Sequence, residues 1–392
     1  MKRVLYFHQY FNVPAMGGSV RSYELAIEMS KKYKVTIISS DRNASNDKVK
    51  IERIASNLKI IWIPNKYSNM MSFSSRIFSF IRFTLKTVKY SITENADIVI
   101  STSTPLTIAI PGLLHKFRYR SRFIFEVRDS WPKVPIELGL LTNPILIFLA
   151  KFLEKLAYKY ADHVVALSPG MAANIREVHS KAKVSVIPNF CNNIVLDSIV
   201  PFRFSSEIET GGKIILYAGT FGYVNNIDYI VELAASFKER DCKFVLVGDG
   251  KYKTDAIAYA RKMKVLNKNV FIFDAVDKNQ IYRMIKRSDF MISTVIDNPV
   301  MWANSANKFF DGLAFLKPII INHKGWLADL ILENNIGVVL DPSVSEDSVE
   351  KISSILEKSN DDMSERLVKM SSGEFSFSSI YTKYETILEG NI

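Results

Sequence analysis

Short apolar runs alternate along the chain with longer stretches in which apolar residues recur every three or four positions. An apolar run of this length, bounded by turn residues, is typical of a buried strand. In the first half of the chain such runs cover residues 3–7, 35–39, 60–63, 97–101, 123–127, 163–167 and 184–187. The stretch after the first run carries Val20, Tyr23, Ala26 and Ile27 at helical spacing. Strands that alternate with helices predict an α/β fold with a parallel sheet.

The pattern begins again in the second half. Residues 192–212 are polar and irregular and end in Gly211-Gly212, so we interpret them as a linker. Further apolar runs follow at residues 213–219, 244–247, 270–273, 290–293, 318–321 and 337–340. We therefore expect two doubly wound, Rossmann-like domains in tandem, residues 1–200 and 201–375. Ligands of such sheets bind beyond the carboxyl ends of the strands.

Composition narrows the protein class. The 392 residues are 48% hydrophobic and 23% charged, which excludes a disordered chain. Cys191 and Cys242 cannot form a disulfide framework, and we expect both in the core. The five histidines show no metal-binding spacing, so we expect no metal site. No window offers about 20 uninterrupted apolar residues, and the N-terminal apolar run is too short for a signal peptide. We expect a cytoplasmic protein without a transmembrane helix.

Charge is distributed unevenly between the two halves. Residues 1–200 carry a net charge of +14, whereas residues 201–392 carry −3. Such asymmetry indicates an anionic partner for the first half. Nucleic acid, a membrane surface and a phosphorylated substrate all satisfy this requirement.

The most basic segment is also rich in aromatic residues. Residues 53–93 contain seven Lys and Arg and no acidic residue. Within them, Phe73–Lys89 can form an amphipathic helix whose cations are Arg76, Arg82, Lys86 and Lys89. This composition favours an interfacial helix on an anionic membrane. The alternative is a helix that faces the core and turns a solvated basic side outward.

Glycine turns follow several predicted strands. Gly17-Gly18 precedes a predicted helix, and Gly219-Thr220 leads from a strand towards a helix that begins near Asn226. Glycine lets a backbone approach a phosphate, and the free N–H groups at a helix start favour anions. The alternative is that each pair forms a simple turn. The chain has no GxGxxG fingerprint and no Walker motif, which argues against dinucleotide binding and P-loop chemistry.

The segment from Asn304 to Leu313 is the most informative. Ser305 is the expected N-cap of a helix whose first turn contains Asn307 and Lys308. A lysine there opposes the helix dipole at a cost of about 0.3–1 kcal/mol when exposed, and a bound phosphate would reverse that sign. We therefore interpret Lys308 as a phosphate ligand rather than a lysine that points to solvent. Asp311, one turn later, is placed to orient Lys308 or to accept a hydrogen bond from a hydroxyl-rich ligand.

Arg128-Asp129 directly follows a hydrophobic strand and precedes Trp131-Pro132. Its place at the carboxyl end of a strand favours a functional role, and the alternative is a surface ion pair.

Together these features resemble the family 4 glycosyltransferases of GT-B fold, and within them the WbuB-like branch that builds bacterial surface polysaccharides. The resemblance extends over nearly the whole chain. It is carried by Gly17-Gly18, 127–132 with 137–140, 166–168, 186–189, 217–220, Val247-Gly248-Asp249-Gly250, 305–311 and the terminal stretch from Phe375-Ser376 to Tyr384-Glu385.

The resemblance implies two Rossmann-like domains facing across a cleft, with residues 376–392 as a terminal helix that returns to the first domain. It implies retaining transfer from a UDP-sugar, N-acetylated or deoxy, without a metal or other cofactor. The donor would lie mainly on the second domain. The acceptor, a polyprenyl-diphosphate-linked saccharide, would lie on the first, at the inner face of the cytoplasmic membrane. The expected donor-binding residues are Gly17, Gly18, Gly219, Thr220, Gly248, Asp249, Asp274, Asn304, Ser305 and Asn307.

The chain departs from the family pattern in its charged residues. Of two glutamates eight positions apart in the family, the earlier falls at Ala303 and the later at Asp311. A family histidine corresponds to Arg128, and the usual diphosphate-binding Arg and Lys fall near Thr220 and Asn226. We expect Lys308, Arg128 and the amides of the glycine loops to replace those cations. Asp129 would then position the acceptor or the sugar, and Asp249 and Asp274 would hold the nucleoside.

Two alternatives remain open at this point. A sugar-nucleotide 2-epimerase uses the same tandem domains, although a basic interfacial helix has no obvious use in it. A non-catalytic nucleic-acid-binding protein would use the +14 half, but the sequence contains no recognisable nucleic-acid module.

Overall fold

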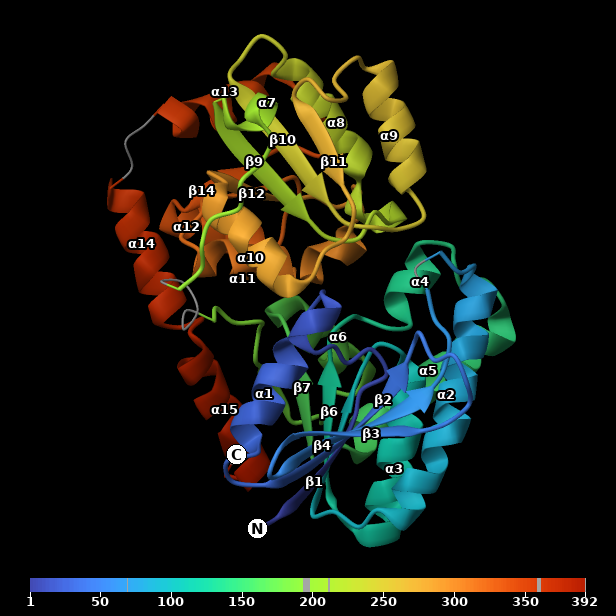
Figure 1. The fold of residues 1–392 in the computed structure, drawn as a ribbon. Coiled ribbons are helices and arrows are strands. Elements are labelled where there is room, and N and C mark those ends of the chain that lie inside the picture. The colour runs from blue at the N-terminus through green and yellow to red at the C-terminus, as the bar shows by residue number, and fades with distance from the viewer. Residues whose placement is uncertain (69, 193–197, 211, 358–360, 392) are drawn as a thin grey trace. The chain divides into compact units, whose positions relative to one another are not determined.

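The chain folds into two compact units (Figure 1). The computed structural model describes residues 1–68, 70–192, 198–210, 212–357 and 361–391. The first unit comprises Met1–Val13, Val20–Pro188 and Lys383–Ile392, and the second comprises Pro14–Ser19 and Asn189–Thr382. The change between units falls after Pro188, ahead of the boundary at 200 expected from the sequence, and the first glycine loop belongs to the second unit. Residues 193–197 and 211 of the expected linker lie outside the described residues.

The first unit is built on a sheet of order β3-β4-β2-β1-β5-β6-β7-β8. Its strands are β1 (Arg3–Phe7), β2 (Lys34–Asp41), β3 (Lys50–Ala55), β4 (Leu58–Pro64), β5 (Ile98–Thr102), β6 (Arg122–Val127), β7 (His163–Ala166) and β8 (Val184–Val186). All neighbours pair in parallel except β3, which runs antiparallel to β4 at the edge. The sequence pattern predicts every strand except β3, whose exposed polar residues do not form an apolar run.

Helices cover both faces of this sheet. They are α1 (Arg21–Met29), α2 (Phe73–Thr93), α3 (Ala109–Tyr119), α4 (Lys133–Glu137), α5 (Pro144–Tyr160) and α6 (Pro169–Val178), with the short η2 (Leu106–Ile108). The helices α2, α5 and α6 begin at Ser72, Asn143 and Ser168, whose side chains accept hydrogen bonds from backbone amides of the first turn. Helix α2 therefore forms where the amphipathic pattern predicts it and extends as far as Thr93.

A buried ion pair joins α1 to the sheet. Arg21 lies 3.4 Å from Glu126, with 2% and 0% of the two side chains exposed. Arg21 also donates to the carbonyl oxygens of Ile187 and Pro188 at the end of the unit. Helix α15 (Phe377–Glu389) carries the chain back from the second unit, and its Glu385 pairs with Lys32 at 2.8 Å.

The second unit has a parallel sheet of order β11-β10-β9-β12-β13-β14. Its strands are β9 (Lys213–Ala218), β10 (Cys242–Val247), β11 (Val270–Phe273), β12 (Phe290–Ser293), β13 (Ile319–Ile321) and β14 (Gly337–Val339). Successive residues of β9 face opposite cores: Leu216 packs in one apolar cluster and Tyr217 in the other. Burial on both faces explains why these strands read as unbroken apolar runs.

Helices flank this second sheet on both sides. They are α7 (Ser206–Glu209), α8 (Ile227–Ser236), α9 (Lys253–Lys262), α10 (Lys278–Arg287), α11 (Asn307–Ala314), α12 (Trp326–Asn334), α13 (Glu346–Glu357) and α14 (Asp361–Ser372), with η1 (Pro14–Met16), η4 (Tyr223–Asn225) and η5 (Pro299–Ala303). Because β9 pairs with both β10 and β12, the loops that follow these three strands meet at one edge of the sheet. Within the described ranges, no helix is both long and apolar enough to cross a bilayer.

Candidate functional site

Two glycine turns pack against each other beyond β9 and β10. A Cβ built on Gly248 would lie 1.8 Å from the carbonyl oxygen of Gly219, and one on Gly250 would lie 2.4 Å from that of Phe221. The amide of Phe221 donates to Asp249 O at 3.0 Å, and the Tyr217 hydroxyl donates to Thr220 O at 2.7 Å. These glycines therefore have a packing role, because only a residue without Cβ allows the two turns to approach this closely.

Lys308 reaches one of these turns from α11. The helix begins at Asn307, and its N-cap is Ala306, whose side chain cannot accept a hydrogen bond, so the expectation that Ser305 caps it is wrong. A Cβ on Gly219 would lie 2.8 Å from Cε and 3.1 Å from Nζ of Lys308. The amine also lies 4.8 Å from the centre of the Tyr217 ring. Lys308 thus brings a cation to the turn after β9.

The charge on Lys308 is held in an unfavourable environment. Within the described part of the chain, its amine has no carboxylate at ion-pair distance. Burial lowers the pKa of this ammonium to about 8, and the more distant Asp311 opposes the shift. An anion bound beside the amine would restore the protonated form, because an opposite charge favours ionisation. This is the electrostatic situation expected of a phosphate-binding lysine.

Asp311 has a different partner from the one the sequence indicates. Its two carboxylate oxygens accept hydrogen bonds from Lys278 Nζ at 2.7 and 2.8 Å. Lys278 is 7% exposed, so the pair lies largely out of water. From the one-turn spacing we expected Asp311 to orient Lys308 or to accept a hydrogen bond from a ligand. In the structure, the carboxylate of Asp311 instead pairs with Lys278. Lys278 is the first residue of α10 and, like Lys308, opposes a helix dipole, which is the sequence signal that could have identified it.

The first glycine loop lies beside these two helix starts. Gly17 and Gly18 have φ of +70° and +73°, a left-handed conformation that glycine adopts without strain. A Cβ on Gly17 would lie 3.0 Å from the carbonyl oxygen of Val276, directly before α10. Ser19 Oγ donates to Asn307 Oδ1 at 3.2 Å. Gly17, Gly18 and Asn307 are therefore brought together within the second unit.

Three buried polar atoms in the segments that follow β12 and β13 have no hydrogen-bond partner among the described residues. They are Asn304 Oδ1, Ser305 Oγ and His323 Nε2. The backbone around them is held firmly, because Asn189 donates to Ser305 O and Trp326 donates to Asn304 O, both at 2.7 Å. Buried polar atoms are normally satisfied, so these are candidates for contact with a ligand.

His323 is a residue that the sequence reasoning missed. Its Nδ1 lies 2.7 Å from the Lys324 carbonyl oxygen, and burial, with a smaller effect from Lys308, lowers the pKa of its imidazole. Its position directly after the predicted strand at 318–321, at the carboxyl edge, is the signal that could have found it.

The two expected nucleoside-binding aspartates lie at the other end of this edge. Asp249 Oδ1 accepts from the amide of Gly250 at 2.8 Å. Asp274 is 98% exposed and pairs with Lys253 at 2.5 Å. Lys253 also donates to the carbonyl oxygens of Gly248 and Phe273 at 3.0 and 3.1 Å, so it ties the ends of β10 and β11 together. Lys253 is a second cation that sequence reasoning missed.

Arg128 and Asp129 belong to the first unit, after β6. Each side chain bonds to a different neighbour. Asp129 Oδ2 accepts from Thr104 Oγ1 at 2.7 Å, and Arg128 NH1 lies 3.4 Å from His8 Nε2. The backbone amide of Arg128 also donates to Ser103 Oγ at 3.1 Å. Burial and the neighbouring Arg128 hold the pKa of His8 well below its usual range. Since the ends of β1, β5 and β6 meet here, these polar side chains lie together at the carboxyl edge of the first sheet.

The four cations expected to bind a membrane all lie on α2, and Arg76 is in its first turn. Asp47, from outside the acid-free stretch, pairs with Arg82 at 3.3 Å and Lys86 at 3.1 Å. Arg76 Nε donates to Met71 O at 3.2 Å, and Lys89 lies 4.8 Å from the Tyr90 ring centre. The same helix turns Phe80 into the core while Phe78 remains 68% exposed. Helix α2 therefore has both a structural face and an exposed apolar face.

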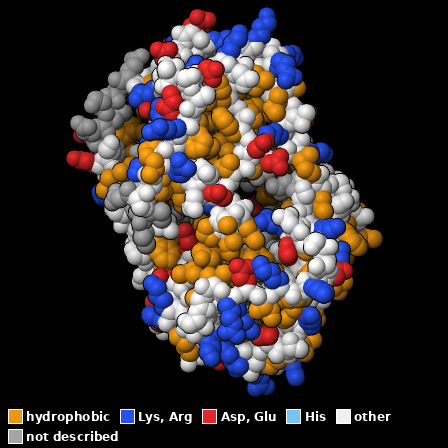
Figure 2. Space-filling model, viewed as in Figure 1, with side chains coloured by type: hydrophobic (Ala, Val, Ile, Leu, Met, Phe, Trp, Pro, Cys, Tyr) orange, Lys and Arg blue, Asp and Glu red, His pale blue; other side chains and the backbone are white. Residues whose placement is uncertain are grey.

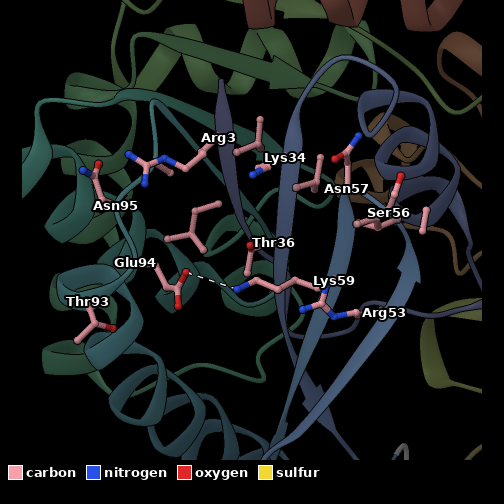
Figure 3. Close-up of a pocket in the computed structure, with 16 residues that line it drawn as sticks. Arg3, Lys34, Thr36, Arg53, Ser56, Asn57, Lys59, Thr93, Glu94 and Asn95 are labelled. Carbon is pink, nitrogen blue, oxygen red and sulfur yellow. Dashed lines mark ion pairs between the residues drawn. The ribbon is translucent and has the colours of Figure 1, made fainter. Parts of the chain in front are cut away.

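A cavity of about 440 Å³ opens at the opposite edge of the first sheet (Figure 3). Its wall includes the amino ends of β1, β2 and β4 and the loop after α2, with Lys59 and Glu94 3.8 Å apart. It contains none of the candidate residues, so we assign it no part in the site. In the ranges that the structure describes, no group of three or more His, Cys, Asp or Glu is placed to hold a metal ion.

Comparison with protein families gives two matches that follow one another along the chain. Residues 16–193 match the model "Glycosyltransferase Family 4", and residues 200–371 match the model "Glycosyl transferases group 1". None of the curated proteins matches the sequence significantly.

Several solved structures share the fold over the whole chain. Sucrose-phosphate synthase from Thermosynechococcus elongatus superposes with a TM-score of 0.77 at 13% identity, covering 100% of this chain and 99% of that one. HepE from Anabaena, in complex with UDP and glucose, gives 0.69 at 11% identity and covers 100% of both chains. WaaG, a glycosyltransferase involved in lipopolysaccharide biosynthesis, gives 0.66 at 16% identity, covering 99% and 100%.

Proposed function

Because the chain is a glycosyltransferase of the GT-B type, we propose that it transfers a sugar from a UDP-sugar to a polyprenyl-diphosphate-linked saccharide. The sugar is N-acetylated or deoxy, and the product belongs to a bacterial surface polysaccharide, O-antigen or capsule, as in the WbuB-like branch. The reaction takes place at the inner face of the cytoplasmic membrane. The specificity rests on the resemblance of the sequence motifs to that branch, and HepE, which shares the fold, is described with bound UDP and glucose.

The single observation that carries the donor proposal is the Lys308 amine against the turn of Gly219, at the start of α11. A diphosphate bound there meets the amides of the first helical turn, the backbone of the glycine turn and one cation that has no carboxylate partner within the described residues. Helix N-termini and glycine turns are general anion-binding elements. Asn304, Ser305 and Asn307 border the same helix start, and Asp249 and Asp274 hold the nucleoside.

The proposed chemistry is a front-side displacement with retention of configuration. The bond between the sugar C1 and the diphosphate oxygen breaks while C1 bonds to the acceptor oxygen on the same face. The acceptor proton passes to the leaving diphosphate, which departs as UDP. Lys308, Arg128 and backbone amides stabilise the growing negative charge, a role in which one donor can contribute about 3–4 kcal/mol. Because protein cations meet the diphosphate, we propose that no metal ion is needed.

The acceptor side of the proposal uses the first unit. Asp129, which already accepts from Thr104, positions the acceptor hydroxyl or the sugar. The +14 charge of residues 1–200 attracts both the diphosphate of a lipid-linked acceptor and the anionic membrane in which it is held. The proposal does not involve nucleic acid.

A ligand panel tests the donor class directly. Thermal shift is measured with UDP, UDP-sugars and GDP-sugars, since a ligand that binds only the folded state raises the melting temperature. We expect stabilisation by UDP and a subset of UDP-sugars. Stabilisation by GDP-sugars alone would contradict the donor proposal. A UDP-sugar that is converted to its 2-epimer, without transfer to an acceptor, would identify an epimerase instead.

A further inference from the structure

Three helices on one face of the first sheet carry an unusual concentration of exposed apolar side chains. Figure 1 shows α2, α3 and α5 side by side, and α3 contacts both of the others. Of 22 large apolar side chains exposed in the described part of the chain, 11 belong to these three helices. They are Phe78, Ile81, Leu85, Ile92, Leu114, Phe117, Ile145, Leu146, Phe148, Leu149 and Phe152. Scattered exposed residues need no explanation, whereas a contiguous patch marks an interaction surface.

The first half of α5 carries five of these eleven side chains, more than either α2 or α3. Ile145, Phe148, Leu149 and Phe152 follow the spacing i, i+3, i+4, i+7 that normally faces a core. Here they are 52–68% exposed, and the rings of Phe148 and Phe152 stack on each other with centres 6.4 Å apart. The stripe that packs inward lies in the second half of the helix and consists of Glu154, Ala157 and Tyr158. The first two turns of α5 therefore present an apolar stripe to the outside.

The exposed charges that the three helices themselves carry are all basic, although Asp47 and Asp162 from neighbouring segments pair with lysines and an arginine of α2 and α3. The one acidic residue of α5, Glu154, is buried and accepts a hydrogen bond from the Tyr158 hydroxyl at 3.1 Å. The exposed charges of α5 are Lys151, Lys155 and Lys159, and neither α2 nor α3 contains an acidic residue. Hydrophobic and basic side chains are interspersed along the margin of the first unit where α2 runs (Figure 2).

We propose that α5, rather than the basic edge of α2, is the element that inserts into an anionic lipid bilayer. An apolar stripe flanked by lysines meets both requirements of that interface, acyl chains for the rings and phosphate headgroups for the amines. A second copy of the chain fits less well, because it would bring the lysines of two α5 helices together. On α2, Asp47 already pairs with Arg82 and Lys86, which reduces the charge available to lipid.

This inference deepens the proposed function, because it names the surface that brings the enzyme to a lipid-linked acceptor. The biological role of this surface depends on the proposed function, whereas the binding of α5 to a bilayer does not. Failure of either is therefore distinguishable: donor binding is measured with UDP in solution, and membrane binding is measured with vesicles in the absence of any donor.

The test compares flotation with vesicles of phosphatidylcholine and phosphatidylglycerol at low and high salt. The variant F148S/F152S removes two rings that are 68% and 53% exposed. The matched control is L332S, which changes a side chain that is 60% exposed in the second unit. We expect the α5 variant to lose about tenfold or more of its binding at both salt concentrations, because burial of apolar area is not screened by salt. The control should float like the parent, with UDP binding unchanged in both variants.

Three outcomes would overturn the proposal. The first is a parent protein that does not float, and the second is an α5 variant that floats as the parent does. The third is a parent dimer in light scattering that F148S/F152S converts to a monomer, which would assign the surface to a second copy. Equal melting temperatures of variant and parent exclude unfolding as the cause of lost binding.

Discussion

Replacing Lys308 by methionine tests the centre of the donor proposal. Methionine keeps most of the length and apolar volume of the side chain and removes only the ammonium. Burial disfavours the charged form of this ammonium when no ligand is bound, so the variant should be more stable than the parent. It should also be a poorer enzyme, because the proposed partner of the diphosphate is lost. Few substitutions both raise the stability of an enzyme and lower its activity.

The expected gain in stability follows from the pKa of about 8 against an ordinary value of 10.5. That difference corresponds to about 3 kcal/mol of unfavourable charging free energy at neutral pH. Lys308 retains some exposure to water, so we expect about half of this, 1–2 kcal/mol, in the free energy of unfolding of the second unit. For a unit of this size that raises the melting temperature by about 2–8 °C.

The pH dependence has a definite sign. Below pH 8 the lysine is charged in both the folded and the unfolded state, so its cost to the folded protein is fully present. Between about pH 8 and 10.5 the folded state has released the proton and the unfolded state has not, and the cost disappears. The stability difference between parent and K308M should therefore narrow as the pH rises through this range.

Calorimetry of UDP binding gives a second, independent readout. A diphosphate beside the amine raises its pKa, so at pH 8 the parent should take up about half a proton on binding UDP. The uptake is obtained from titrations in buffers of different ionisation enthalpy. In K308M the uptake should vanish, UDP affinity should fall, and kcat should fall by about 10²–10³-fold.

Lys317 supplies the matched control. Burial also lowers the pKa of its ammonium, and its amine donates to Lys286 O at 3.1 Å, at the amino end of β13 and away from the site. We expect K317M to leave UDP affinity and proton uptake unchanged. If K308M binds UDP as tightly as the parent and takes up the same fraction of a proton, Lys308 does not meet the diphosphate and the reasoning fails.

Three further outcomes are expected. Activity should persist in excess EDTA, because protein cations meet the diphosphate; loss that Mn²⁺ restores would contradict this. D311N leaves Lys278 largely buried without its carboxylate and should lower the free energy of unfolding by about 3 kcal/mol in urea titrations, whereas an unchanged midpoint would show that the pair is weak. G248A places a Cβ 1.8 Å from Gly219 O and should lower both the melting temperature and UDP affinity; unchanged values of both would mean that the two turns separate freely.

The strands could be predicted from the sequence because their signal is local. A strand buried on both faces is an unbroken apolar run, and each of the predicted runs forms a strand within a few residues of its expected ends. The one described strand that no apolar run marks, β3, lies at the sheet edge, where exposed Lys50 and Arg53 and half-buried Glu52 interrupt the apolar pattern. The glycine turns could also be predicted, since the end of a strand and the glycine that follows it are both identified from neighbouring residues.

The candidate site was predictable only as far as it depends on neighbours in sequence. Lys308 stood out because a lysine in the first turn of a helix violates a local rule. The sequence did not show that Asp311 pairs with Lys278, because Lys278 lies 33 positions away and is brought to it by the packing of α10 against α11. The N-cap of α11 was expected at Ser305 because a serine is a preferred capping residue, but a preference does not fix the position, and in the folded chain the N-cap is Ala306, one residue later.

The sequence by itself determined the alternation of strands and helices, the turns at the strand ends and the surplus of positive charge in the first half. Only the tertiary structure decided which apolar stripes are covered. Ile145, Phe148, Leu149 and Phe152 have the spacing of a core-facing helix, yet the fold packs only the second half of α5 against its neighbours. Periodicity states which side chains share a face, but burial depends on what the rest of the chain brings to that face, and no local pattern contains that information.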